Sequence, residues 1–197
     1  MDKINAEEFL RLTKNNSSWA AELTKPLEVC GFLRADKSPI THLSPHLHFT
    51  GENSSNWSAS FENCRLLTKA EGKFSGAVSF IQTGITEIGE IEVEMGKKES
   101  RGLSCTFFNC KQLKEARGKY KGRVYFGAAG IRTIGELECK EADFSGCLVE
   151  KIKGPIRIPD PRNKIVNIPV LVIEDYLRRK FRETLRHKKT VPEEMVI

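Results

Sequence analysis

An internal repeat constrains this chain more than any other feature of its sequence. Residues 61–93 and 107–139 align without a gap at an offset of 46 residues, and 16 of their 33 positions are identical. Similarity at a fixed period is typical of repeat proteins, in which each unit buries its apolar face only by stacking on its neighbours. The sequence therefore predicts a short array of stacked units.

Each unit contains two similar halves. Both halves contain the pattern apolar-x-Phe, and a Cys, Thr or Ala follows three positions after the Phe. We call the position of this Phe the anchor. The anchor positions, including a weaker first copy, are Ala35, Phe61, Phe80, Phe107, Phe126 and Phe144. Three alternating residues predict a short strand, and parallel strands stacked about 4.8 Å apart would align the anchors in one buried column. Six anchors predict six turns.

A second apolar pair in several turns predicts a second strand on the opposite wall. These pairs are Leu47 with Phe49, Ile91 with Val93, Leu137 with Cys139, and Ile156 with Ile158. Glycines are expected where the chain turns with positive φ or passes close to a neighbour, at positions 72, 76, 84, 118, 122 and 130. The predicted fold is mainly β with helical caps, a short parallel-β solenoid of about six turns.

Three stretches of the sequence carry a resemblance to a known family. They are the apolar cadence of residues 27–43, the pattern F-x-N-C-x-x-L and the pattern F-x-x-T-G-I-x-x-I. Over about residues 27–158 the chain resembles short leucine-rich-repeat-like bacterial proteins that alternate a Cys turn with a Thr-Gly-Ile turn. The resemblance implies a right-handed solenoid, a bacterial source and a non-enzymatic binding role.

The two ends of the chain differ from the repeat. We expect residues 1–28 to form an N-terminal helical cap, 29–158 the repeat solenoid, and 159–197 a Pro-containing linker and a basic C-terminal helix. Asn5 and Glu8 have the spacing of a capping box, which predicts a helix from about Ala6 to Thr13.

The C-terminal helix is expected from about Val172 to His187. Apolar residues at helical spacing are Ile173, Tyr176, Leu177, Phe181 and Leu185, and the other face carries Arg178, Arg179, Arg182 and Arg186. Two interpretations are open, a cap docked on the last turn and a helix that binds a partner. The arginine face also suggests binding of nucleic acid or another polyanion, although such a run is often a solvated face.

Overall charge and hydropathy exclude some classes of protein. The formal net charge is +6, and residues 160–197 contribute +3 of it with nine basic and six acidic side chains. No apolar run approaches the roughly 20 residues that cross a bilayer, so membrane insertion is not expected. The first residues lack the features of a secretory signal, which suggests a cytoplasmic protein or one delivered into a host without a classical signal peptide.

Two insertions fall at the same place in the repeat cycle, and insertions in repeat proteins often mark the binding edge. The first, residues 50–58, contains Trp57, and the second, residues 94–104, contains Lys97, Lys98 and Arg101. An aromatic side chain in a polar loop is a candidate interface anchor, and folding back onto the sheet is the alternative.

Side chains that could carry chemistry are few. Six cysteines without a C-x-x-C pair are expected to be reduced thiols in the core. The cluster His42, His46 and His48 could bind a metal, but no carboxylate or cysteine has ligand spacing beside it, so a solvated face is preferred. No nucleotide-binding or catalytic motif is present, so no catalytic residue, cofactor or metal is predicted.

Outward carboxylates allow one enzymatic alternative. Glu90, Glu92, Glu136 and Glu138 are expected to alternate outward on strands two turns apart, and such pairs could act as acid and base on a polysaccharide. Exposed glutamates between core residues are also ordinary strand design. The leading hypothesis is a non-enzymatic module that binds a macromolecule, most simply a protein, through its sheet face and inserted loops.

Overall fold

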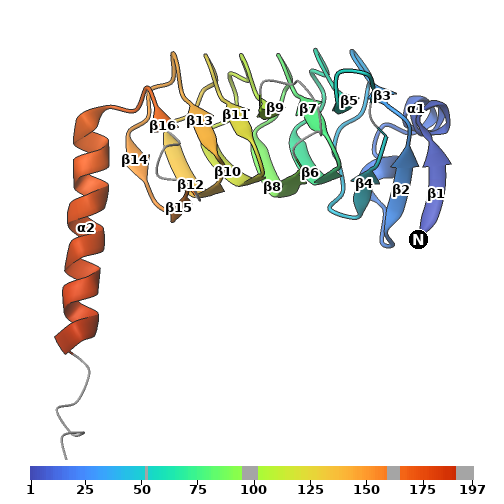
Figure 1. Cartoon of the computed structure of the whole chain (residues 1–197). Coiled ribbons are helices and arrows are strands. Elements are labelled where there is room, and N and C mark those ends of the chain that lie inside the picture. The colour runs from blue at the N-terminus through green and yellow to red at the C-terminus, as the bar shows by residue number, and fades with distance from the viewer. Residues whose placement is uncertain (52, 95–101, 159–164, 190–197) are drawn as a thin grey trace, which may run out of the picture.

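The computed structural model describes residues 1–51, 53–94, 102–158 and 165–189, with side chains described as far as Arg182 in the last helix. This part of the chain forms two parallel sheets, two α-helices and one short 3-10 helix. The predicted mainly-β class is confirmed. Figure 1 shows the strands side by side along an elongated body, with α1 (Ala6–Asn15) near one end and α2 (Val170–Lys189) beyond the other.

The larger sheet has nine strands, in the order β1-β2-β4-β6-β8-β10-β12-β14, with β15 also paired to β12. The bounds are β1 Asp2–Asn5, β2 Leu27–Cys30, β4 Leu47–Phe49, β6 Lys69–Phe74, β8 Glu87–Val93, β10 Glu115–Tyr120, β12 Thr133–Glu138, β14 Lys151–Ile152 and β15 Ile156–Arg157. The apolar pairs expected on a second wall lie in or directly beside strands β4, β8, β12 and β15.

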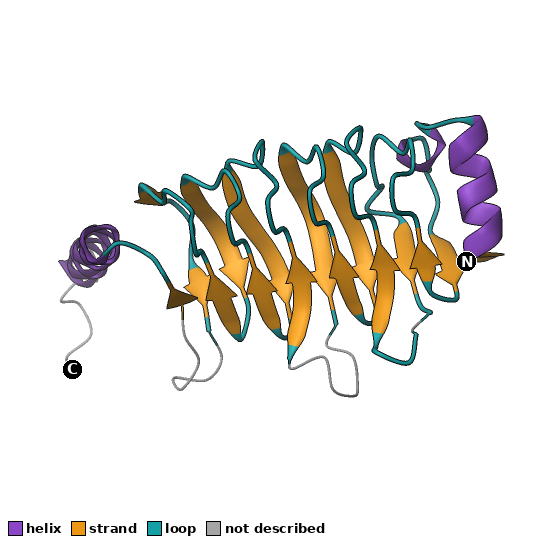
Figure 2. Cartoon of the chain, turned by 90° about the horizontal axis from the view of Figure 1, so that it is seen from above, coloured by secondary structure: helices purple, strands orange, loops and turns teal. Residues whose placement is uncertain are grey.

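The smaller sheet has seven strands, in the order β16-β13-β11-β9-β7-β5-β3. The bounds are β3 Leu33–Arg34, β5 Trp57–Ser60, β7 Ala77–Ser79, β9 Leu103–Thr106, β11 Arg123–Tyr125, β13 Glu141–Asp143 and β16 Ile165–Val166. From β2 to β13 the chain passes alternately from one sheet to the other. We call one strand of each sheet with its connections a circuit, and each strand pairs with the equivalent strand of the next circuit. Figure 2 shows this arrangement from a perpendicular direction.

The anchor phenylalanines form a buried column between the two sheets. Phe61, Phe80, Phe107, Phe126 and Phe144 are fully buried, and successive rings stack with centroids 5.1–5.4 Å apart and planes 5–10° apart. Each anchor directly follows a strand of the smaller sheet, so parallel pairing of those strands also aligns the rings. The spacing of the rings along the column therefore follows the spacing of the paired strands.

The corner after each anchor uses a left-handed residue. Two positions beyond the anchors, φ is positive at Lys37, Asn63, Gln82, Asn109, Ala128 and Gly146. Only the last of these is glycine, which the sequence did not lead us to expect. The glycines predicted for turns lie elsewhere and have two roles. Gly72 and Gly118 have positive φ. At Gly84, Gly122 and Gly130 the chain passes so close to its neighbour that a Cβ would lie 2.1–2.3 Å from a backbone oxygen.

The N-terminal end is closed by α1. The Asn5 side chain accepts a hydrogen bond from the backbone nitrogen of Glu8 (2.8 Å), as a helix N-cap does. The Glu8 carboxylate pairs with Arg11, at 2.6 Å. Phe9 is fully buried and meets the ring of Phe49 edge-on, with centroids 5.7 Å apart. Residues 2–5, which precede the helix expected from about Ala6, form strand β1.

The C-terminal helix is longer than expected and docks through only part of its surface. Val172 and Tyr176 pack against the core, and Arg179 Nη2 donates a hydrogen bond to the carbonyl oxygen of Ile152 in β14 (2.6 Å). Leu177 and Phe181, expected on the same apolar face, are 58% and 66% exposed. The apolar residues of α2 therefore divide between a docked face and an exposed one.

Candidate functional site

A row of ionisable side chains crosses the outer face of the larger sheet, and its charges alternate in sign from Lys73 to Arg157. Strand register aligns one outward residue from each of eight strands, in the order Lys3, Glu28, His48, Lys73, Glu92, Lys119, Glu138 and Arg157. The neighbours of these residues along each strand are mostly buried, so alternation along the strand directs the row outward. We call these eight residues the charged row.

Ion pairs connect several members of the charged row. Lys3 Nζ lies 2.9 Å from Glu28, Lys73 Nζ lies 3.6 Å from Glu92, and an Arg157 nitrogen lies 4.0 Å from Glu138. A side-chain hydrogen bond from Lys3 lowers the pKa of the Glu28 carboxyl, and a bond from Thr50 adds to the effect. Exposed pairs of this kind contribute little to stability. Their alternation instead sets a pattern of charge that a partner can match.

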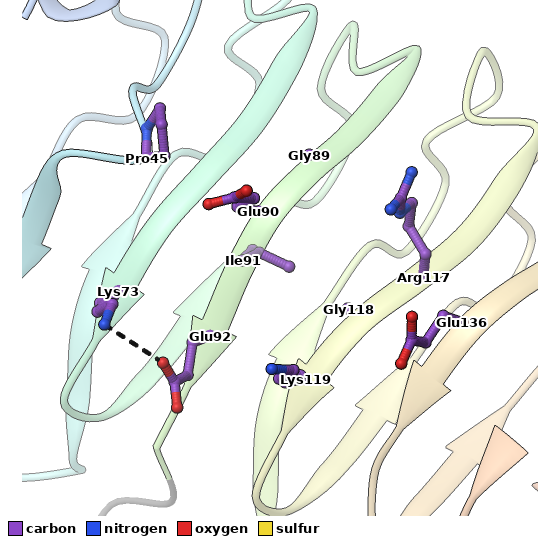
Figure 3. A pocket seen from close by; sticks show the side chains of 10 residues that line it. All are labelled: Pro45, Lys73, Gly89, Glu90, Ile91, Glu92, Arg117, Gly118, Lys119 and Glu136. Carbon is purple, nitrogen blue, oxygen red and sulfur yellow. Dashed lines mark ion pairs between the residues drawn. The ribbon is translucent and has the colours of Figure 1, made fainter. Parts of the chain in front are cut away.

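A hollow of about 390 Å³ opens in the middle of this face, as Figure 3 shows. Three bases and three acids line it: Lys73, Arg117, Lys119, Glu90, Glu92 and Glu136. The hollow lies where strand register shifts, at Gly72 in β6 and Gly118 in β10, both of which have positive φ. These two bulges displace the backbone and leave room that side chains of neighbouring strands do not fill.

Glycine at position 89 is explained by a carboxylate from the preceding circuit. A Cβ on Gly89 would lie 1.9 Å from Glu71 Oε1, an atom that also pairs with Lys69 (3.0 Å). The equivalent Gly135 is overlaid by Glu115 in the same way, with Oε1 2.5 Å from the Cβ position. The glycine of the Ile-Gly-Glu segment common to both repeats is therefore explained by the close approach of this carboxylate.

The four glutamates expected to face outward have two different settings. Glu90, Glu92 and Glu136 line the hollow, and Glu138 lies outside it. Arg157 lies near both Glu136 (3.5 Å) and Glu138 (4.0 Å). Acids and bases lie together in the hollow, and Lys73 is joined to Glu92 by an ion pair in Figure 3. The arrangement offers both signs of charge to a ligand.

The histidine cluster is divided by the fold. His48 belongs to the charged row, while His42 Nε2 lies 3.3 Å from the hydroxyl of Thr68. Within residues 1–51, 53–94, 102–158 and 165–189, no group of three or more His, Cys, Asp or Glu side chains could hold a metal ion.

All six cysteines are free thiols, and four of them are buried. Burial raises the pKa of Cys64 to about 11 and that of Cys139 to about 12, and it also raises the pKa of Cys105 and Cys110. A thiol with a raised pKa is a poor nucleophile at neutral pH.

Trp57 lies on the other side of the molecule, at the start of β5. It is half-buried and lines a second hollow of about 280 Å³ outside the smaller sheet, together with Phe32, Arg34, Asp36 and Glu62. Sequence reasoning identified Trp57 but missed its acidic neighbours, because they come from different circuits. The other loop candidates, Lys97, Lys98 and Arg101, lie outside the described residues.

The basic candidates on α2 are far from Trp57, beyond the opposite end of the body in Figure 1. Arg178 and Arg182 are exposed, whereas Arg179 is half-buried and bound to Ile152 and Asp175. Arg186 falls within α2, but its side chain lies outside the described residues. The structure therefore separates the residues that the sequence suggested for partner binding into different surfaces.

Comparisons of the chain with protein-family models, with curated proteins and with solved structures found no match. No helix in the described part of the chain combines the length and apolar character needed to span a membrane.

Proposed function

We propose that this chain is a non-enzymatic recognition scaffold, a capped solenoid resembling the leucine-rich-repeat-like arrays, and that it binds a protein through the outer face of its larger sheet. The charged row around the central hollow is the observation that carries this proposal. The hollow is lined by three acidic and three basic residues, so its formal net charge is zero. A surface that alternates in sign suits a protein partner with a complementary pattern, and it does not favour a ligand of one charge.

Rigidity supports the same function. Each member of the charged row lies on a strand, and the residues beside it in that strand mostly pack into one core. The backbone positions of the charges are therefore fixed by the core. A preorganised surface loses less entropy on binding than a flexible one. The six free cysteines fit a reducing compartment, where we expect this scaffold to act.

The test is a charge reversal in the middle of the row. We expect Lys73→Glu combined with Lys119→Glu to abolish cross-linking to proteins that the native chain captures, because both changes place like charges beside Glu92. The matched control is Lys37→Glu with Arg65→Glu, two exposed residues in the corners between the sheets. Identical sets of cross-linked proteins from the row variant and the native chain would exclude this face as the binding surface.

A second candidate function is polyanion binding by α2. Arg178 and Arg182 are exposed one turn apart on a helix that extends beyond the two sheets. This proposal predicts retention on a polyanion resin that falls steeply with added salt and disappears in Arg178→Glu/Arg182→Glu. Absence of retention at low salt would exclude it.

A further inference from the structure

The hollow outside the smaller sheet combines aromatic walls with two carboxylates. Trp57 and Phe32 line it, and both are partly exposed. Asp36 and Glu62 lie in the same hollow and come from the corners of successive circuits. Its volume of about 280 Å³ has room for the end of one long side chain.

One of the two carboxylates already has a cationic partner. Asp36 Oδ2 accepts a hydrogen bond from Arg34 Nε (2.9 Å), while its Oδ1 accepts from the hydroxyl of Ser60 and from the backbone nitrogen of Glu62 (3.1 Å). Arg34 therefore neutralises Asp36 and holds it in place.

Glu62 is oriented but not neutralised. Its Oε1 accepts a hydrogen bond from the Ser79 hydroxyl (3.0 Å), a donor on the adjacent strand β7. No lysine or arginine in the described part of the chain forms an ion pair with Glu62. With one base and two acids, the hollow carries a formal charge of −1.

The backbone at Trp57 is also held in place. Asn53 Oδ1 accepts hydrogen bonds from the backbone nitrogens of Ser55 (2.9 Å) and Trp57 (3.0 Å), and Asn53 N donates to the Trp57 carbonyl oxygen (3.1 Å). Trp57 then pairs with Ala77 in the sheet. The indole is thus attached to a closed turn beside Glu62, an arrangement preorganised for a ligand.

We propose that this hollow binds the guanidinium group of an arginine side chain presented by a protein partner. A planar guanidinium stacks on an aromatic face and donates two parallel hydrogen bonds to a carboxylate, and here the carboxylate of Glu62 lacks a counter-ion. Its charge complements the −1 of the hollow. The presence of a protein partner rests on the proposed function, but this site is separate from the charged row.

The experiment uses N-acetyl-arginine methylamide as the probe and tryptophan fluorescence as the readout. The chain has two tryptophans, so Trp19→Phe, which keeps an aromatic ring beside Phe9, leaves Trp57 as the only reporter. In this background we expect a saturable change in fluorescence. The citrulline analogue, which has the same shape without the charge, should give none.

Two variants locate the site. Glu62→Gln keeps an acceptor for Ser79 but removes the charge, and it should weaken binding of the probe at least about tenfold. Glu150→Gln, an exposed glutamate outside both hollows, should leave binding unchanged. Lack of a saturable signal, equal binding of the citrulline analogue, or unchanged binding in Glu62→Gln would each overturn the proposal. Because the probe does not touch the charged row, the proposed function can fail while this site still binds, and the reverse also holds.

Discussion

The Cys110 thiol donates a hydrogen bond to the carbonyl oxygen of Phe80, one circuit earlier, at 2.9 Å. The same relationship joins Cys64 to Ala35 (2.9 Å) and Cys147 to Phe126 (3.0 Å). These cysteines follow their anchors by three positions. Each adds a second donor to a carbonyl group at the corner of the neighbouring circuit, because that carbonyl also accepts a hydrogen bond from Ser38, Thr83 or Ala129 of its own circuit. The small side chain that the repeat requires there is thus also a donor in alternate turns.

Replacing this donor should destabilise the fold. We expect Cys110→Ala to lower the free energy of unfolding by about 1–2 kcal/mol, because a small void remains and the Phe80 carbonyl loses one of its two side-chain donors while keeping the Thr83 hydroxyl. Urea unfolding measures the change. Cys30→Ala is the matched control, since Cys30 is half-buried and its thiol contacts the Glu28 carboxylate at the surface. Equal losses in the two variants would contradict the role assigned to Cys110.

Stability should fall at alkaline pH because of the buried thiols. The folded chain raises the pKa of Cys64 to about 11 and of Cys139 to about 12, whereas the ordinary value is 9.0. Between those values the unfolded chain releases protons that the folded chain retains, so the contribution is complete below about pH 9 and is lost as pH rises toward 11–12. Each thiol should lower the free energy of unfolding by about 1.4 kcal/mol per pH unit in this window.

Urea unfolding between about pH 8 and pH 10.5 measures this dependence, and Cys64→Ala with Cys139→Ala provides the comparison. The double variant should show a shallower decline than the native chain. Parallel curves for the two proteins would show that other groups, not these thiols, cause the loss.

The phenylalanine column should dominate the stability of the core. Phe107 stacks on Phe80 and on Phe126, with centroids 5.2 and 5.3 Å apart, and is fully buried. Phe107→Ala should cost about 3–5 kcal/mol in unfolding free energy. The neighbouring Phe108 is 37% exposed and stacks on Tyr125, so Phe108→Ala should cost only about 1 kcal/mol. A reversed order in chemical denaturation would contradict the assignment of the core column.

The left-handed corners predict a pair of opposite effects. Ala128 has a φ of 53°, in the region that disfavours residues with a Cβ, and Gly146 has the equivalent position one turn later with a φ of 71°. Ala128→Gly should raise the free energy of unfolding by about 0.5–1 kcal/mol, and Gly146→Ala should lower it by a similar amount. Thermal unfolding of the two variants measures both signs, and a loss in Ala128→Gly would show that the corner is unstrained.

Much of the core was accessible from the sequence. The offset of 46 residues and the alternation around each anchor predicted the buried ladder of Phe61, Phe80 and Phe107, because local pattern alone decides which side chains face inward. The donor role of Cys110 was missed, since its acceptor lies 30 residues earlier. The left-handed residue at the corner was missed because five different residue types occupy it.

The candidate surfaces depended much more on tertiary structure. Sequence pattern predicted that Glu92 would face outward from a strand and that Trp57 would lie in an inserted loop, whereas it assigned no position to Lys73. Only the folded chain decided that Lys73 pairs with Glu92, and that Trp57 lies in one hollow with Glu62. Contacts between circuits depend on the register of the paired strands. The lengths of the loops and the bulges at Gly72 and Gly118 set this register together, and a local pattern of residues does not contain that information.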